Sequence, residues 1–150
     1  FRSMQMTHIP YKGATPAMTA LMAGDIDLMF ESGPAVMPHV VNGKLKLIVV
    51  GSGHRSLALP QIPTVAESGV PGFHATTWAG LLAPIGLPKP IVEKLNGEVR
   101  KALADPALRE RLIKLGAEPL DMSAADSHAY IAKGIALWAG AVKASGATAD

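Results

Sequence analysis

The sequence contains no cysteine, few aromatic residues and no long apolar run. Without cysteine there can be neither a disulfide framework nor a thiolate site. The apolar runs fall short of the roughly 18 residues that a membrane-spanning helix needs. Residues 1–6 also lack the charged, then apolar, then small pattern of a signal peptide. We therefore interpret the sequence as beginning within a longer protein.

The sequence also has no large excess of positive or of negative charge. Lys and Arg together number 14 and Asp and Glu 12, which leaves a net charge of +2. Because the cations are dispersed and aromatic residues make up only 5%, the sequence predicts no nucleic-acid surface. The apolar fraction of 49% argues against disorder. The 150 residues suffice for one compact core, or for one lobe and part of another.

The first half of the sequence alternates between strand-like and helix-like segments. Apolar patterning predicts strands at 6–11, 26–30, 45–51 and 73–83. Between the first three strands, Thr15-Pro16 and Ser32-Gly33-Pro34 are typical helix starts, and Gly24 and Asn42-Gly43 are typical helix ends. This order predicts a parallel α/β sheet flanked by helices. A Thr64–Glu67 capping box predicts one more short helix within the proline-rich connection at 52–72.

After about residue 84 the pattern becomes helical. Ile91, Leu95, Val99 and Leu103 recur on one helical face. Further helices are predicted between Asp105 and Gly116 and between Ser123 and Gly146, with a short strand at 118–120. Each amphipathic face needs an apolar partner. We therefore hypothesise that part of a second lobe lies upstream of Phe1.

No catalytic or metal-binding constellation is apparent. The five histidines, at positions 8, 39, 54, 74 and 128, have no spacing that would build a zinc site. Neither a nucleophile elbow nor a phosphate-binding glycine loop is present. Asp25 and Asp27 could mimic a carboxylate pair, but a role in supporting a loop explains them more simply. The sequence therefore predicts a protein that is not an enzyme and uses no metal or cofactor.

Two helix starts are the best candidates for a binding site. In parallel sheets the loops that follow the strands gather at one edge, where ligands bind. A helix N-terminus offers unpaired N–H groups and a partial positive charge to a carboxylate. Thr15 and Ser32 would add hydroxyl donors, and Gly13 and Gly33 would permit close backbone approach. The pattern alone leaves open the alternative that both starts are simply good N-caps.

Several motifs occur in a diagnostic order. They read HIPYKGATPA at residues 8–17, GDIDLMF at 24–30, GKLK at 43–46, LPQIPTVAESG at 59–69 and WAGLLAP at 78–84. This series resembles the Bug family, the extracytoplasmic receptors of tripartite tricarboxylate transporters. The resemblance covers nearly the whole chain and matches the second half of those receptors.

The resemblance implies a two-lobed, type II periplasmic binding-protein fold. Residues 1–83 would form the α/β ligand-binding lobe 2, with a parallel-rich sheet flanked by helices. Residues 84–150 would supply the hinge crossover and the C-terminal helices that belong to lobe 1, the rest of lobe 1 being missing. Such a receptor works in the periplasm. It binds a small organic carboxylate or amino acid and delivers it to membrane transporter subunits.

Carried onto this sequence, the lobe 2 ligand contacts fall on Gly13, Ala14, Thr15, Ala17, Glu31 and Ser32. The family often has DNLP where this chain has ESGP at 31–34, which leaves the identity of the ligand open. A half-receptor would also expose the surface between its lobes, and exposed apolar surface favours homo-oligomers. The alternative function is therefore a solitary lobe that has lost ligand binding and acts as a self-associating module.

Overall fold

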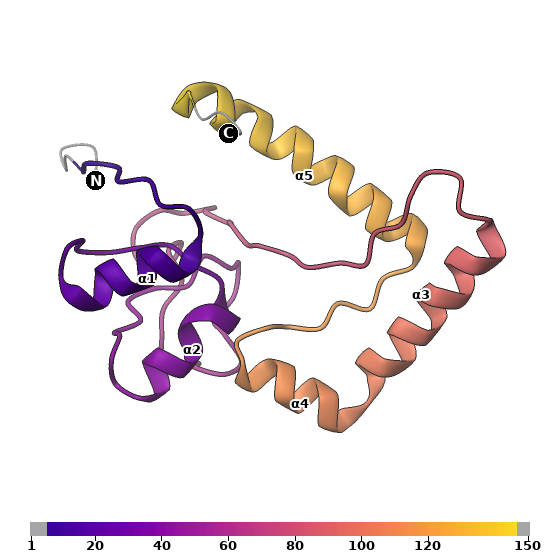
Figure 1. Ribbon diagram of the computed structural model, residues 1–150, viewed down its shortest axis with the longest axis horizontal. Helices are drawn as coiled ribbons and strands as arrows, with labels where there is room; N and C mark the ends of the chain where they lie inside the picture. Colours follow the sequence, from indigo (N-terminus) through magenta and orange to yellow (C-terminus); the bar gives the residue numbers. More distant parts are fainter. Residues whose placement is uncertain (1–5, 147–150) are drawn as a thin grey trace. The chain divides into compact units, whose positions relative to one another are not determined.

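The computed structural model describes residues 6–146, which fold into two compact units (Figure 1). The first unit comprises the described part of Phe1–Ala79 together with Leu112–Glu118. The second comprises Gly80–Arg111 and the described part of Pro119–Asp150. The chain therefore passes between the units after Ala79, after Arg111 and after Glu118.

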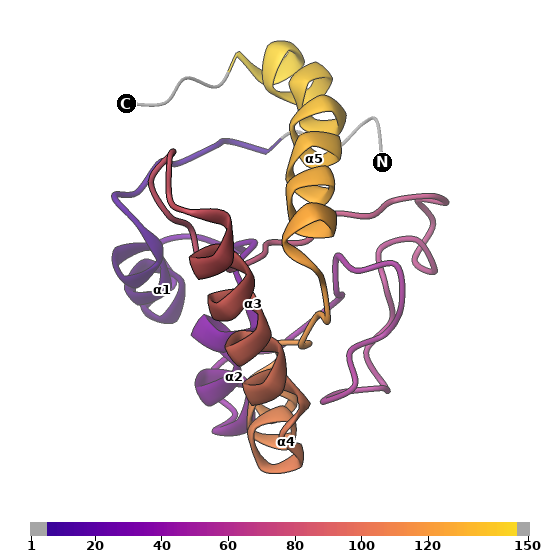
Figure 2. The same cartoon turned by 90° about the vertical axis from the view of Figure 1, so that its right-hand side faces the viewer.

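The first unit is built around helices α1 (Ala14–Ala23) and α2 (Gly33–Val41), which lie side by side in Figures 1 and 2. Its apolar core is small: the buried hydrophobic side chains are Met18 and Ala20 of α1 and Met37 of α2. Two predicted helix ends are confirmed. Gly24 closes α1 in the left-handed conformation, with φ of 85°, where glycine avoids the steric penalty of a Cβ. Asn42 is the C-cap of α2.

The segments predicted as strands do not form a sheet among residues 6–146. These segments are 6–11, 26–30, 45–51, 73–83 and 118–120, and all of them lack assigned strand structure. The backbone pairing found is a single parallel bridge between Val50 and Thr64. The predicted parallel sheet is therefore not confirmed in the described residues. Alternating polarity favours extended backbone, but a strand also requires a neighbour at hydrogen-bonding distance along its length.

The bridge anchors the connection at 52–72. The Val50 N–H donates to the Pro63 carbonyl and the Val65 N–H donates to the Val50 carbonyl, both at 3.0 Å. The predicted capping box is confirmed in its hydrogen bonds: the Glu67 N–H donates to Thr64 Oγ1 at 3.0 Å, and the Thr64 N–H donates to Glu67 Oε2 at 2.8 Å. These residues form a turn rather than the predicted helix. Thr64 is only 2% exposed, so the capping box is a structural feature of this loop.

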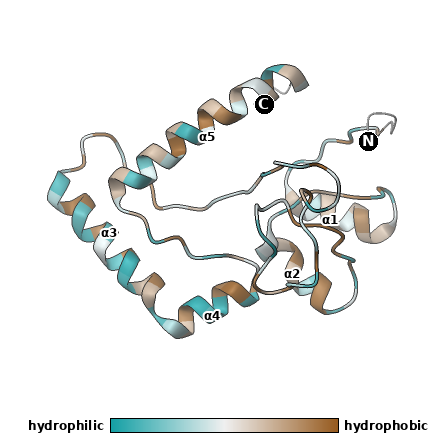
Figure 3. Ribbon diagram, turned by 180° about the vertical axis from the view of Figure 1, so that it is seen from behind, coloured by the Kyte–Doolittle hydropathy of each residue, from teal (hydrophilic) through white to brown (hydrophobic). Residues whose placement is uncertain are grey.

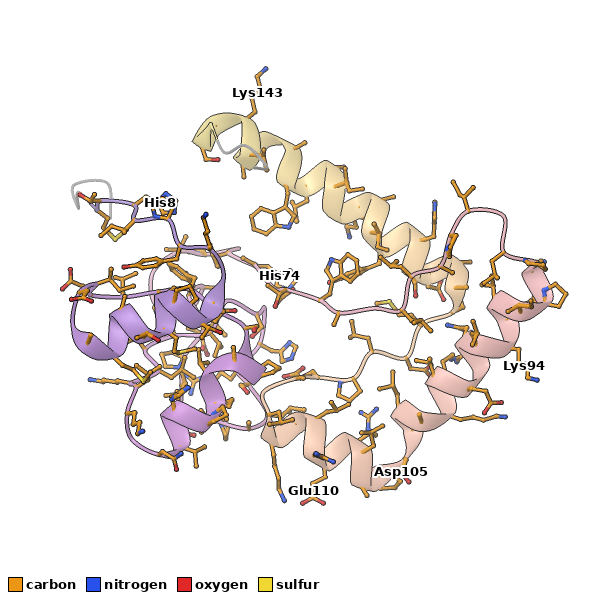
Figure 4. All side chains as sticks on the ribbon, in the orientation of Figure 1. His8, His74, Lys94, Asp105, Glu110 and Lys143 are labelled. Atoms are coloured by element: carbon orange, nitrogen blue, oxygen red, sulfur yellow. The ribbon has the colours of Figure 1, made fainter. Side chains whose placement is uncertain are left out.

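The second unit contains α3 (Lys89–Ala104), the first part of α4 (Pro106–Lys114) and α5 (Ala124–Ser145). Asp105 lies at the junction of α3 and α4 (Figure 4), where its Oδ1 accepts the Leu108 N–H at 2.8 Å. Ser123 and Asp126 form a reciprocal capping box at the start of α5. All three helices were predicted, with Asp105 and Ser123 as their caps, and those predictions are confirmed.

The apolar faces of the second unit are not covered within the described residues. Ile91, Leu95 and Val99 of α3 are 46%, 42% and 38% exposed, and Trp138 of α5 is 44% exposed. Hydrophobic and hydrophilic positions alternate along α3 and α4 in Figure 3. Amphipathic helices derive most of their stability from a packed apolar face. These helices thus present the unpaired surface that the sequence predicts.

Candidate ligand-binding site

Gly13 sets the start of α1. Its φ of 104° and ψ of 176° turn the chain into a helix that begins at Ala14, and its N–H donates to the Tyr11 carbonyl at 2.9 Å. The prediction that Thr15 is the N-cap, with Pro16 as the first helical residue, is therefore wrong. The left-handed φ at Gly13 brings the chain into the helical conformation one residue before Thr15.

This shift leaves two backbone donors at the start of α1. The first N–H groups of a helix have no intrahelical acceptor, and Pro16 carries no N–H. The N–H groups of Ala14 and Thr15 therefore have no acceptor within α1. The N-cap Gly13 has no side chain to cap the helix, and the Thr15 carbonyl accepts the Thr19 hydroxyl at 3.1 Å. Thr15 is exposed, so its hydroxyl can be reached by a ligand.

The start of α2 has a different electrostatic character. Ser32 is the N-cap, as predicted, but its hydroxyl makes no capping bond. Instead Glu31 accepts the Ser32 N–H on its Oε1 at 2.8 Å. A carboxylate in this position complements the positive end of the helix dipole. It also places a negative charge at the start of α2.

A hollow of about 310 Å³ lies between α1 and α2. Ala14 and Thr15 line it together with Met18, Thr19, Met22, Ala35 and His39. Of the predicted ligand contacts, the structure thus brings Ala14 and Thr15 to a common cavity. Gly13, Ala17, Glu31 and Ser32 are not among its lining residues. Gly13 and Ala17 instead belong to the cap and first turn of α1, and Glu31 and Ser32 to the entry of α2.

The sequence-based prediction missed the other lining residues. Ala14, Met18 and Met22 recur every four residues, a spacing that places them on one helical face. Thr15 and Thr19 form a parallel row on the same side. This periodicity could have revealed the α1 wall of the hollow. No comparable signal in the sequence could have placed His39 of α2 opposite it.

Residues 6–146 contain no group of three or more His, Asp or Glu side chains placed to hold a metal ion. No helix among them is long and apolar enough to cross a membrane. Trp78, which the sequence places on a strand, is 47% exposed and lies in a segment without strand structure.

Comparison with known proteins places these features in a family. Residues 2–147 match the model of the tripartite tricarboxylate transporter family receptor. BugT of Bordetella pertussis is 37% identical over 139 residues, which are 93% of this chain and 43% of BugT. This chain therefore spans less than half the length of that relative.

Solved structures agree in their fold. Rpa4515 of R. palustris, solved with adipate, has a TM-score of 0.88 at 33% identity, and the periplasmic binding protein BugD has a TM-score of 0.82 at 38% identity. Each match covers 95% of this chain and 48% of the other. MatC of Rhodopseudomonas palustris, solved with malate, is 41% identical over 73% of this chain and 37% of its own, with a TM-score of 0.65.

The matched chains are periplasmic binding proteins, so the path of this chain follows that fold even though residues 6–146 contain a single bridge between extended segments. The expected resemblance to the Bug receptors is confirmed by the family model and by BugT. The chain belongs to the tripartite tricarboxylate transporter family of receptors.

Proposed function

We propose that this chain is part of a periplasmic solute receptor that binds a small carboxylate-bearing metabolite for a tripartite tricarboxylate-type transporter. The observation that carries the proposal is the start of α1, where the N–H groups of Ala14 and Thr15 have no acceptor within the helix and both residues line the hollow between α1 and α2. Amide donors at a helix N-terminus suit a carboxylate without any metal or cofactor. The proposed role is binding without catalysis, since holding a carboxylate needs only these hydrogen-bond donors.

The predicted contacts divide into two roles. Gly13, Ala14, Thr15 and Ala17 surround the start of α1 and would hold a ligand carboxylate. Glu31 and Ser32 lie at the start of α2, where the Glu31 carboxylate already accepts a hydrogen bond from the Ser32 N–H. A ligand group near Glu31 would therefore be a hydroxyl, an ammonium or a methylene chain rather than a second carboxylate.

The ligands of solved relatives support a carboxylate class. Rpa4515 was solved with adipate and MatC with malate, two dicarboxylates of different length and polarity. Backbone amides and hydroxyls accept either, so these relatives support the class rather than one compound. An amino acid remains within the proposal because its carboxylate could bind α1 and its ammonium could face Glu31.

Lobe assignment extends the proposal to the rest of the chain. Residues 1–83 would be the ligand-binding lobe 2, and residues 84–150 the hinge crossover and the helical part of lobe 1. The compact units, which divide after Ala79, lend support to a boundary in this region. Other parts of a complete receptor would then supply the opposite wall of the ligand site and the contacts with the membrane transporter subunits.

A graft tests the proposal in a complete receptor. The segment of Rpa4515 that aligns with this chain is replaced by residues 6–146, and adipate and malate are titrated calorimetrically. Saturable binding that weakens at least tenfold on Thr15→Val supports the proposal. A graft that melts cooperatively yet binds neither acid contradicts it. Adipamide, which lacks carboxylates, is the control ligand and should not bind.

A further inference from the structure

Residues 112–118 have an unusual place in the chain. They belong to the first unit, whereas the residues on both sides of them belong to the second. They comprise the end of α4 and the turn that follows it, in which the Gly116 N–H donates to the Ile113 carbonyl at 2.8 Å and the Ala117 N–H to the Leu112 carbonyl at 3.0 Å. The segment is therefore held in a defined local conformation by its own hydrogen bonds, and the residues before and after it belong to the second unit.

Two glycines bring this segment against the start of α2. A Cβ atom added to Gly33 would clash with the carbonyl oxygen of Gly116. A Cβ atom added to Gly116 would lie 3.1 Å from Gly33 Cα and 3.0 Å from Cγ of Met37. The two backbones thus touch without side chains between them. The contact extends to Met37, one of the buried core side chains.

A second attachment fixes the other end of the segment. Glu118 Oε2 lies 2.7 Å from His54 Nε2, which ties the end of the segment to the connection at 52–72. The Glu118 side chain is 33% exposed. Residues 112–118 are therefore held at Gly116 by steric fit and at Glu118 by a polar contact, and both attachments lie within the first unit.

The Gly33 contact adjoins the predicted ligand residues. Gly33 is the first residue of α2, directly after the N-cap Ser32 and the carboxylate of Glu31. We infer that residues 112–118 are a positioning element for the start of α2, and that the Gly33–Gly116 contact sets where Ser32 and Glu31 meet a ligand. This inference rests on the proposed function for its consequence in binding, whereas the contact itself can be tested without any ligand.

Gly33→Ala is the test substitution. Gly33 does not have the left-handed φ that excludes other residues, and alanine is a better helix former than glycine. Any loss therefore comes from the clash with Gly116. Gly97→Ala is the matched control, because Gly97 also lies in a helix and a Cβ there would have no atom within 4 Å. Gly116→Ala is less informative because its φ of 75° strains alanine wherever its neighbours lie.

The first measurement is amide hydrogen exchange of the 150-residue chain. We expect Gly33→Ala to raise exchange at least tenfold in the α2 first turn and in residues 112–118, while α1 stays as protected as in the parent. Gly97→Ala should leave all three segments unchanged. Unchanged exchange in Gly33→Ala, or an equal rise throughout the first unit, would overturn the inference, because the second result marks general destabilisation.

A second measurement addresses binding with adipate as the probe. In nitrogen–proton correlation spectra we expect Gly33→Ala to abolish the adipate-induced shifts of the amides of Ser32 and of residue 33. The shifts of Ala14 and Thr15 should remain. Loss of both sets, or of neither, would overturn the positioning role. If adipate shifts no signal of the parent chain, the graft into Rpa4515 decides on the proposed function, while the exchange experiment still decides on the contact.

Discussion

Arg55 donates from its Nε to both carboxylate oxygens of Glu67, at 3.0 Å each. Its Nη1 also donates to the Pro60 carbonyl at 3.2 Å. Glu67 in turn accepts the Thr64 N–H. The Arg55 guanidinium therefore links Pro60 and Glu67 within the connection at 52–72. Glu67 connects it to Thr64, which forms the bridge with Val50.

Replacing Arg55 should loosen this loop. Arg55→Lys keeps the charge but cannot reach Glu67 and Pro60 together, because lysine lacks the planar fork of arginine. We expect both Arg55→Lys and Arg55→Gln to lower the melting temperature and to raise hydrogen exchange at 56–68. Lys44→Gln, at an exposed cation outside the loop, is the control. Equal melting temperatures for Arg55→Lys and the parent would show that the second hydrogen bond contributes nothing.

Acid should weaken the same loop. The hydrogen bond from Arg55 is the main cause that lowers the pKa of Glu67, and the hydrogen bond with the backbone of Thr64 adds to it. Because the folded-state pKa is below the unfolded one, the stabilisation is complete above the ordinary glutamate value of about 4.3. It is lost as the pH falls through the lowered folded-state pKa.

Melting curves across pH check this expectation. The difference in melting temperature between the parent and Glu67→Gln should be constant from neutral pH to about pH 5 and shrink below the ordinary value of about 4.3. Both groups are solvent-exposed, so the difference should also be modest and fall with added salt. Asp25→Asn supplies the control for general acid effects. A difference that grows on acidification would contradict the assigned sign.

The capping box of α5 predicts a specific order of variants. The Asp126 N–H donates to Ser123 Oγ at 3.1 Å, and the Ser123 N–H donates to Asp126 Oδ2 at 3.4 Å. Ser123→Ala should lower the free energy of unfolding by about 1 kcal/mol, whereas Ser123→Gly should lower it by only a few tenths. Urea unfolding followed by circular dichroism measures both. Equal losses would assign the effect to packing rather than to the cap.

The uncovered face of α3 predicts association of the isolated chain. Ile91, Leu95 and Val99 are well exposed, and apolar surface of this kind drives contact between copies. Light scattering should give a mass that rises above the monomer as the concentration increases. The double change Leu95→Glu and Val99→Glu should restore the monomer. Lys94→Glu, on the solvent side of α3 in Figure 4, should not.

Helix boundaries could be predicted from the sequence because they depend on local chemistry. Gly24, Asp105 and Ser123 act on neighbours within a few residues, and the structure confirms each of them. Thr15 failed for an equally local reason, since the backbone angles of Gly13 start the helix earlier. Those angles cannot be derived from residue preferences alone.

Contacts between distant segments could not be predicted. His54 and Glu118 are 64 residues apart, and nothing in either neighbourhood indicates the pairing. The predicted strands show the same limit, because the apolar pattern at 45–51 favours extended backbone without identifying a partner. In the candidate site, the donors of α1 followed from local sequence, but the place of His39 in the hollow depended on how α2 packs against α1.

The account depends most directly on a carboxylate binding at the start of α1. Titration of the labelled chain with adipate, followed in nitrogen–proton correlation spectra, tests this in the protein as it is. We predict weak, saturable shifts centred on the amides of Ala14 and Thr15 and extending to Ser32, with no such shifts from adipamide. Shifts scattered over α3 and α5, or identical shifts with adipamide, would contradict the account. No saturable shift in this chain together with no binding by the Rpa4515 graft would contradict it as well.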